Sequence, residues 1–190
     1  MEVQEIHEPI PPLSEDEYDR SPGTHLTDVL KSAEQLLFQE KSVQTRSFGE
    51  PRCCMETGFL WERLLTLVFR SALGVRLGEV DLDGIAGSPD GIGDDPQDEF
   101  PFAVEEYKAT WKSSRRRIEE NWLYMAQAKS YCKMLGTQVC VFRVLYIVGD
   151  YRGSGPQYRK YRIRFTRREL EDNWRMVLNH KRWMEENGGL

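Results

Sequence analysis

The order of hydrophobic patterns after residue 57 limits this chain to a small set of folds. Helical spacing alternates there with the period-two alternation and β-branched runs that are typical of strands. The expected elements are a helix over 57–74, short strands over 75–87, a strand over 100–111, a helix over 115–136, strands over 137–151 and 157–166, and a helix over 166–186. This order predicts an α/β (α+β) fold, in which helices flank a mixed central β-sheet.

The N-terminal part has a different character from the rest. Residues 1–23 are acidic and rich in proline, which predicts a flexible arm, and a helix is expected over 24–38 before an irregular polar stretch over 39–55. The chain has 190 residues, 39% of them hydrophobic, which suits a single domain over 24–190. Because we find no membrane-spanning apolar run and no secretory signal, we expect a cytoplasmic protein without membrane contact.

Charge is distributed unevenly along the chain. Residues 1–110 carry 9 basic and 23 acidic side chains, whereas residues 111–190 carry 17 basic and 8 acidic ones. A basic half beside an acidic site suits a partner that carries phosphate groups, although solvated helix faces produce the same imbalance. The four cysteines, at 53, 54, 132 and 140, lack the paired spacing of zinc ligands, so free thiols are expected in preference to an iron–sulfur cluster.

An acidic pair and a lysine form the most informative constellation. Glu106 and Lys108 lie two residues apart in an expected strand and therefore share one face. Asp90, in the stretch GSPDGIGDD, is expected to reach them from the neighbouring strand. Two carboxylates, with the backbone carbonyl of Tyr107, would suit a hard divalent cation. The alternatives are a plain turn at Asp90 and an exposed ion pair between the other two residues.

These residues resemble the signature of the PD-(D/E)XK nuclease superfamily. Pro89-Asp90 matches its PD element, and Glu106-Tyr107-Lys108 matches its ExK element. Glu62 matches an additional acidic position in the preceding helix. Gln127 and Tyr131 match the QxxxY element of the RecB-like exonuclease branch, and they share a helix face. The resemblance covers about residues 57–150 and implies a restriction-endonuclease-like core with the order αβββαβ.

The resemblance implies a metal-dependent deoxyribonuclease. Asp90 and Glu106 would bind Mg²⁺ or Mn²⁺, assisted by Glu62 and the carbonyl of Tyr107. Lys108 would position water and stabilise charge on the phosphate, while Gln127 and Tyr131 would shape the site. The branch favours an exonuclease of phage type, acting in recombination, repair or phage DNA metabolism in a bacterial cell. An endonuclease of restriction or junction-resolving type and a non-catalytic DNA-binding adaptor remain the alternatives.

DNA contacts are expected from basic and aromatic residues near the site. They comprise Trp111, Lys112, Arg115, Arg116, Arg117, Lys129 and Lys133. A homo-oligomer or a recombination partner protein is also compatible with the resemblance. Two minor expectations concern GSPDGIGDD: its glycines at 87, 91 and 93 are expected to bend the chain, and Asp94 and Asp95 are expected to lie in a solvated loop.

Overall fold

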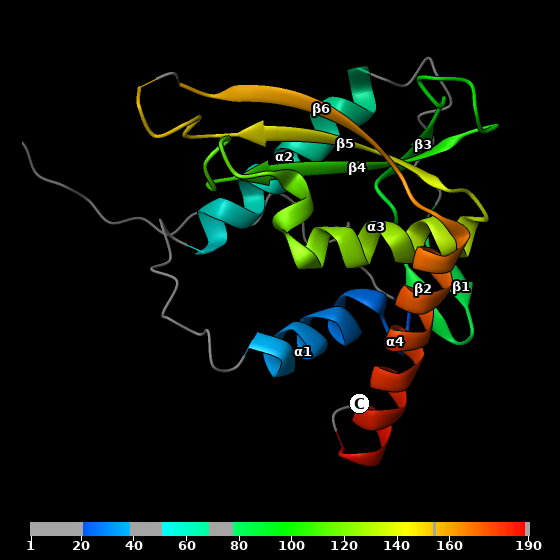
Figure 1. Ribbon diagram of the computed structural model, residues 1–190. Helices are drawn as coiled ribbons and strands as arrows, with labels where there is room; N and C mark the ends of the chain where they lie inside the picture. The colour runs from blue at the N-terminus through cyan, green and yellow to red at the C-terminus, as the bar shows by residue number, and fades with distance from the viewer. Residues whose placement is uncertain (1–20, 39–50, 69–77, 154, 189–190) are drawn as a thin grey trace, which may run out of the picture.

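A four-stranded mixed sheet forms the centre of the computed structural model, which describes residues 21–38, 51–68, 78–153 and 155–188 (Figure 1). Its strands are β3 (Gly91–Gly93), β4 (Ala103–Thr110), β5 (Val139–Tyr146) and β6 (Gln157–Arg164), which lie side by side in that order. β4 and β5 run parallel, with Glu106 opposite Phe142, and the other two pairs are antiparallel. The predicted mixed α+β architecture is therefore confirmed.

The two short strands before the sheet form a separate hairpin. β1 (Val80–Leu82) pairs with β2 (Ile85–Gly87) outside the four-stranded sheet. The turn between them places Asp83 and Gly84 at φ 53° and 68°. The carboxylate of Asp83 accepts a hydrogen bond of 2.8 Å from the indole Nε1 of Trp174, which ties the hairpin to the C-terminal helix.

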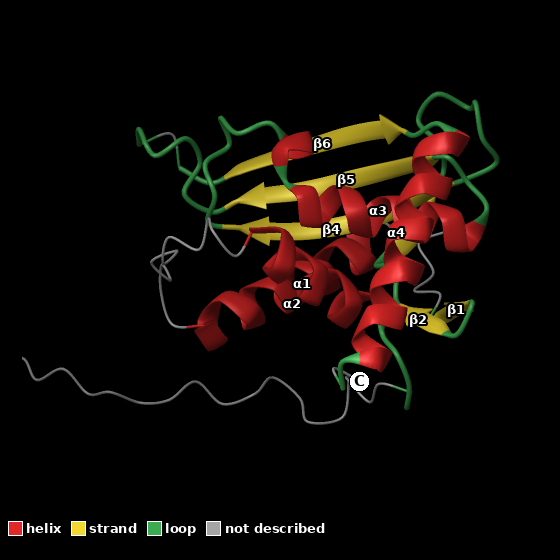
Figure 2. Cartoon of the chain, turned by 60° about the horizontal axis from the view of Figure 1, so that its bottom comes forward, coloured by secondary structure: helices red, strands yellow, loops and turns green. Residues whose placement is uncertain are grey.

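Helices cover both faces of the sheet. α2 (Pro51–Val68) crosses behind the sheet, while α3 (Trp122–Leu135) lies on the front face (Figures 1 and 2). α1 (Leu26–Phe38) and α4 (Arg167–Glu186) pack against α3 on the side away from the sheet. The main core lies between β4, β5 and α3, and a smaller cluster of Ala103, Val139 and Val141 lies on the opposite face.

The helix boundaries correct two expectations. α2 begins at Pro51, inside the stretch expected to be irregular, because proline fits the first turn of a helix. The helix expected over 115–136 is divided. A 3-10 turn, Ile118–Glu120, precedes α3. The N-cap of α3 is Asn121, whose side-chain oxygen accepts a hydrogen bond from Tyr124 N. The three arginines at 115–117 therefore precede both helical segments.

Several smaller expectations are confirmed. α3 ends at Gly136 in the left-handed conformation (φ 75°), and α4 begins with a capping box between Thr166 and Glu169. Cys132 and Cys140 are buried free thiols, whereas the side chains of Cys53 and Cys54 lie outside the described residues.

Within the described ranges, no helix is both long enough and apolar enough to cross a membrane. Most of the expected arm, residues 1–20, also lies outside them.

Asp95 corrects the expectation of a solvated loop. It is 3% exposed, and its carboxylate accepts hydrogen bonds from the backbone N–H groups of Gln97, Glu99 and Phe100. Arg162 of β6 binds both carboxylate oxygens, at 2.6 and 2.9 Å. These contacts outweigh burial and hold the pKa of Asp95 far below its usual range. The residue fastens the loop after β3 to the sheet.

Candidate functional site

Asp90 lies directly before β3 and turns its carboxylate toward β4. β3 begins at Gly91, opposite Glu105, so the next backbone donor on this edge of β4, Tyr107 N, has no partner in β3. The Oδ2 atom of Asp90 fills that place and accepts a hydrogen bond of 2.7 Å from Tyr107 N. The expectation that Asp90 reaches β4 from the adjacent strand is thus met by its geometry.

Glu106 and Lys108 lie on the face of β4 that packs against α3. The Lys108 Nζ atom is 2.5 Å from Glu106 Oε2 and 3.6 Å from Asp90 Oδ2. Glu106 is 1% exposed, whereas the Lys108 side chain is 16% exposed. Burial opposes the charged form of Lys108, but the carboxylates of Glu106 and Asp90 outweigh it and raise the pKa of Lys108 well above its usual range. The lysine is therefore a cation held between two carboxylates.

α3 closes the inner side of this cluster. Tyr131 is buried, and its hydroxyl accepts a hydrogen bond of 3.2 Å from Gln127 Nε2. Burial and the nearby carboxylates of Glu106 and Asp90 raise the pKa of Tyr131, so its phenol stays protonated. The structure therefore brings five predicted site residues together: Asp90, Glu106, Lys108, Gln127 and Tyr131.

The glycines of GSPDGIGDD have a role that differs from the expected one. None of Gly87, Gly91 and Gly93 adopts a positive φ, so the chain does not need them for a bend. They permit close packing instead. A Cβ atom on Gly87 would lie 2.9 Å from Cε1 of Tyr131, and one on Gly93 would lie 2.6 Å from a carboxylate oxygen of Glu105. Residues with side chains would push both partners away from their positions.

The oxygen atoms near Asp90 fit a divalent cation. Asp90 and Glu106 each present a carboxylate to the same Lys108 Nζ. The N–H and C=O groups of one strand residue point to the same edge of the strand. Because Tyr107 N donates to Asp90, the carbonyl of Tyr107 also lies on the Asp90 side of β4, just before β3 begins. Hard cations such as Mg²⁺ prefer this oxygen set.

The third predicted acidic ligand is not placed by the structure. The side chain of Glu62 lies outside the described residues, although its backbone belongs to α2, which contacts β4. Among the described side chains, no group of three His, Cys, Asp or Glu residues gathers in a way that would hold a metal ion. Glu56, six residues before Glu62 on the same helix, is buried. The described part of the site therefore supplies two carboxylates and one backbone carbonyl.

A buried polar network on the opposite face of β4 was not predicted. Glu105 accepts two hydrogen bonds from Arg143 of β5, at 2.6 and 3.1 Å, and one of 2.7 Å from the hydroxyl of Tyr107. Tyr158 of β6 contacts both Arg143 and Trp61 of α2. The sequence signal for this network is Arg143 itself, because a charged side chain in the apolar run VCVFRVLY requires a buried partner.

The predicted DNA-contacting residues divide into two groups. Lys129 lies over the ring of Phe165, between β6 and α4, and Lys133 pairs with Glu171 of α4 at 2.5 Å. The structure thus does not bring these two lysines to the site. The other group lies just beyond the end of β4 and comprises Trp111, Lys112, Arg115, Arg116 and Arg117. Within it, Arg115 pairs with Asp150 and Arg117 with Glu119.

The fold is similar to those of solved nucleases, whereas sequence comparison finds no relative. No family model and no curated protein matches the chain. Two crystal structures of LHK-Exo match over 87% of this chain and 89% of theirs, with a TM-score of 0.53. One is the alkaline exonuclease from Laribacter hongkongensis, at 16% identity, and the other is its complex with dAMP, at 17%. A structure named SSO0001 matches over 87% of this chain and 79% of its own, with a TM-score of 0.51 and 14% identity. At these identities, the likeness shows the fold alone.

Proposed function

We propose that this protein is a metal-dependent DNA nuclease, most compatible with an exonuclease. The observation that carries the proposal is the placement of the Asp90 and Glu106 carboxylates within 4 Å of the Lys108 Nζ atom, on a fold similar to that of an alkaline exonuclease. A complex of that neighbour with dAMP supports a nucleotide substrate. The predicted role in recombination, repair or phage DNA metabolism, and any oligomer or partner protein, remain part of this proposal.

The proposed cation would lie against the carboxylates of Asp90 and Glu106 and the carbonyl of Tyr107. When bound, Mg²⁺ or Mn²⁺ supplies Lewis-acid stabilisation of the charge that builds up on the phosphate. The hydrogen bond from Tyr107 N fixes the direction of the Asp90 carboxylate before substrate arrives. Glu62 stays a predicted additional ligand.

Lys108 supplies the positive charge of the proposed reaction. Its ammonium lies between two carboxylates, and it is the described cation closest to Asp90 and Glu106. As water attacks the phosphorus and one backbone P–O bond breaks, this group would orient the water and donate a hydrogen bond to a phosphate oxygen. The buried phenol of Tyr131 and its partner Gln127 hold the inner wall of the site in place.

Cleavage of linear and closed circular duplex DNA tests the proposal and separates its two forms. With Mg²⁺ or Mn²⁺ we expect release of nucleotides from linear DNA, no cleavage of the circle, and complete loss of activity with a chelator. Cleavage of both substrates would identify an endonuclease instead. A protein that binds DNA but cleaves neither substrate with either metal would be the adaptor, and the proposal would fail.

A further inference from the structure

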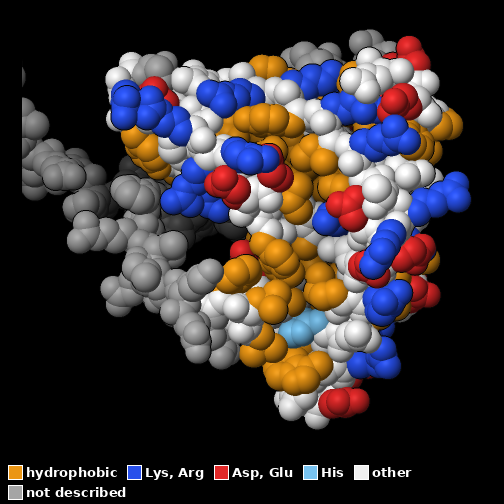
Figure 3. Space-filling model, in the orientation of Figure 1, with side chains coloured by type: hydrophobic (Ala, Val, Ile, Leu, Met, Phe, Trp, Pro, Cys, Tyr) orange, Lys and Arg blue, Asp and Glu red, His pale blue; other side chains and the backbone are white. Residues whose placement is uncertain are grey.

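A pocket lies beyond the carboxyl ends of the parallel strands β4 and β5, close to the proposed catalytic site. Its volume is about 70 Å³, and its walls include Thr110 at the end of β4 and Tyr146 at the end of β5. Ligands of open α/β sheets generally bind beyond the carboxyl ends of parallel strands. Basic side chains occur at this end of the molecule beside a few acidic ones (Figure 3). The pocket thus has the position and the surroundings of a ligand site.

Tyr124 of α3 joins this pocket to the proposed catalytic site. Its ring lines the pocket and stacks on Phe142 of the core, which fixes its position. Lys108 Nζ lies 5.8 Å from the ring centroid, and Lys112 Nζ lies 5.7 Å from the same centroid. One aromatic ring is therefore contacted by the lysine of the catalytic site and by a lysine of the pocket.

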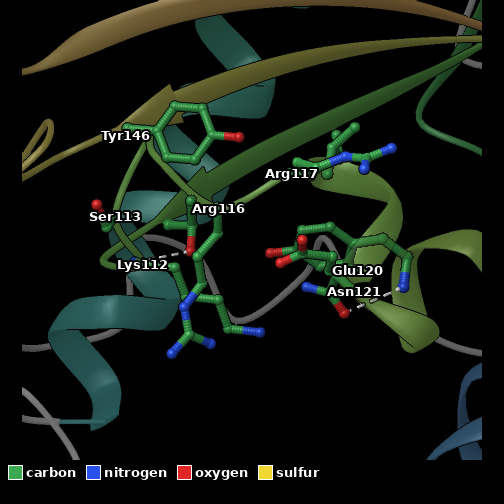
Figure 4. Close-up of a pocket in the computed structure, with 10 residues that line it drawn as sticks. Lys112, Ser113, Arg116, Arg117, Glu120, Asn121 and Tyr146 are labelled. Carbon is green, nitrogen blue, oxygen red and sulfur yellow. Dashed lines mark hydrogen bonds between the residues drawn. The ribbon is translucent and has the colours of Figure 1, made fainter.

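Two cations of the pocket are available for a ligand. Arg115 and Arg117 have carboxylate partners in Asp150 and Glu119, as described above. Lys112 and Arg116, in contrast, form no salt bridge with any described residue. Figure 4 shows their side chains extending in the same direction, and Glu120, the acidic residue of the lining, belongs to the other wall.

Backbone contacts hold the segment that carries these two cations. The hydroxyl of Thr110 accepts a hydrogen bond of 3.1 Å from Lys112 N. Ser114 N donates a hydrogen bond to the carbonyl of Gly149, and the carbonyl of Ser114 accepts a hydrogen bond of 2.7 Å from the Arg159 guanidinium. A segment fixed in this way presents its cations with little loss of conformational entropy when a ligand binds.

We propose that this pocket binds the DNA phosphate next to the scissile one on the same strand, through Lys112 and Arg116. Tyr124 separates the two phosphate positions. The proposal rests on the nuclease function proposed above, and it assigns a substrate subsite to two of the basic residues while excluding Arg115 and Arg117. Charge-assisted hydrogen bonds to one phosphate would position the strand relative to Lys108.

Linear duplexes that each carry one uncharged methylphosphonate linkage test this subsite. In single-turnover cleavage by the wild type, neutralising the phosphate adjacent to the scissile one should slow the reaction about tenfold or more. The double variant Lys112→Met/Arg116→Met should be slower on unmodified DNA by a similar factor. The same neutral linkage should then slow the variant further by less than about twofold, because the contact is already lost.

Arg168→Met is the control, since Arg168 lies exposed on α4 and pairs there with Asp172 of the same helix. This variant should keep the rate and the linkage sensitivity of the wild type. The subsite is overturned if the neutral linkage slows the double variant by the same factor as it slows the wild type. It is also overturned if the double variant cleaves unmodified DNA at the wild-type rate. A wild type that cleaves no DNA with either metal would overturn the nuclease proposal as well, so the two failures are distinguishable.

Discussion

Replacing Asp90 by asparagine is expected to lower the single-turnover rate of DNA cleavage at least about 100-fold. The substitution removes one of the two described carboxylates that face Lys108 Nζ. The asparagine side chain retains an oxygen that accepts the hydrogen bond from Tyr107 N, so the local backbone should be preserved. Lys108→Met should cause a loss of similar size, because it removes the cation beside Asp90 and Glu106. Rates measured with saturating Mg²⁺ or Mn²⁺ check both variants.

The exposed Asp172→Asn on α4 serves as the control for these rates. It changes charge by the same amount as Asp90→Asn, and its partners Arg168 and Arg175 lie on the same helix. Far-ultraviolet circular dichroism at the assay temperature should match the wild type for all three variants, which shows that a lost rate is not a lost fold. If Asp90→Asn or Lys108→Met retained more than about a tenth of the wild-type rate, the assigned roles would be wrong.

Replacing Arg143 by methionine is expected to lower the free energy of unfolding by about 3–5 kcal/mol. The side chains of Arg143 and Glu105 are 9% and 5% exposed and form a two-point ion pair. Without the guanidinium, the Glu105 carboxylate would remain buried with the Tyr107 hydroxyl as its donor. Urea unfolding followed by tryptophan fluorescence measures the loss.

A second variant separates the lost ion pair from lost packing. Glu105→Leu/Arg143→Met replaces both charges by apolar groups, and it should recover a substantial part of the stability. Lys133→Met, which breaks the solvated pair with Glu171, serves as the comparison. It should lower the free energy of unfolding by less than about 1 kcal/mol. A cost for Arg143→Met as small as that of Lys133→Met would show that the buried network does not stabilise the sheet.

The sequence predicts the architecture well because its main elements have clear periodicity. The run TQVCVFRVLY becomes β5, and the alternation in VEEYKAT correctly places Glu106 and Lys108 on one face of β4. The capping box at Thr166 also depends only on residues three positions apart. Such patterns can be recognised in the sequence because each depends on residues that are close together within one helix or strand.

The missed features depend on contacts between segments far apart in the sequence. Asp95 is an ordinary loop residue until Arg162, 67 positions later, folds back onto it. The pair of Glu105 and Arg143 requires knowledge that both faces of β4 are covered, which alternation alone does not provide. The glycines at 87 and 93 are explained by Tyr131 and Glu105 rather than by a turn.

Binding of Mn²⁺ in the absence of DNA tests the proposed metal site most directly. Electron paramagnetic resonance follows the loss of the free-ion signal as protein is added, and it does not depend on catalysis. The wild type should bind Mn²⁺, Asp90→Asn and Glu106→Gln should each weaken binding at least about tenfold, and the exposed Glu186→Gln should leave it unchanged. Equal Mn²⁺ affinity of the wild type and of both site variants would contradict the assignment of Asp90 and Glu106 as metal ligands.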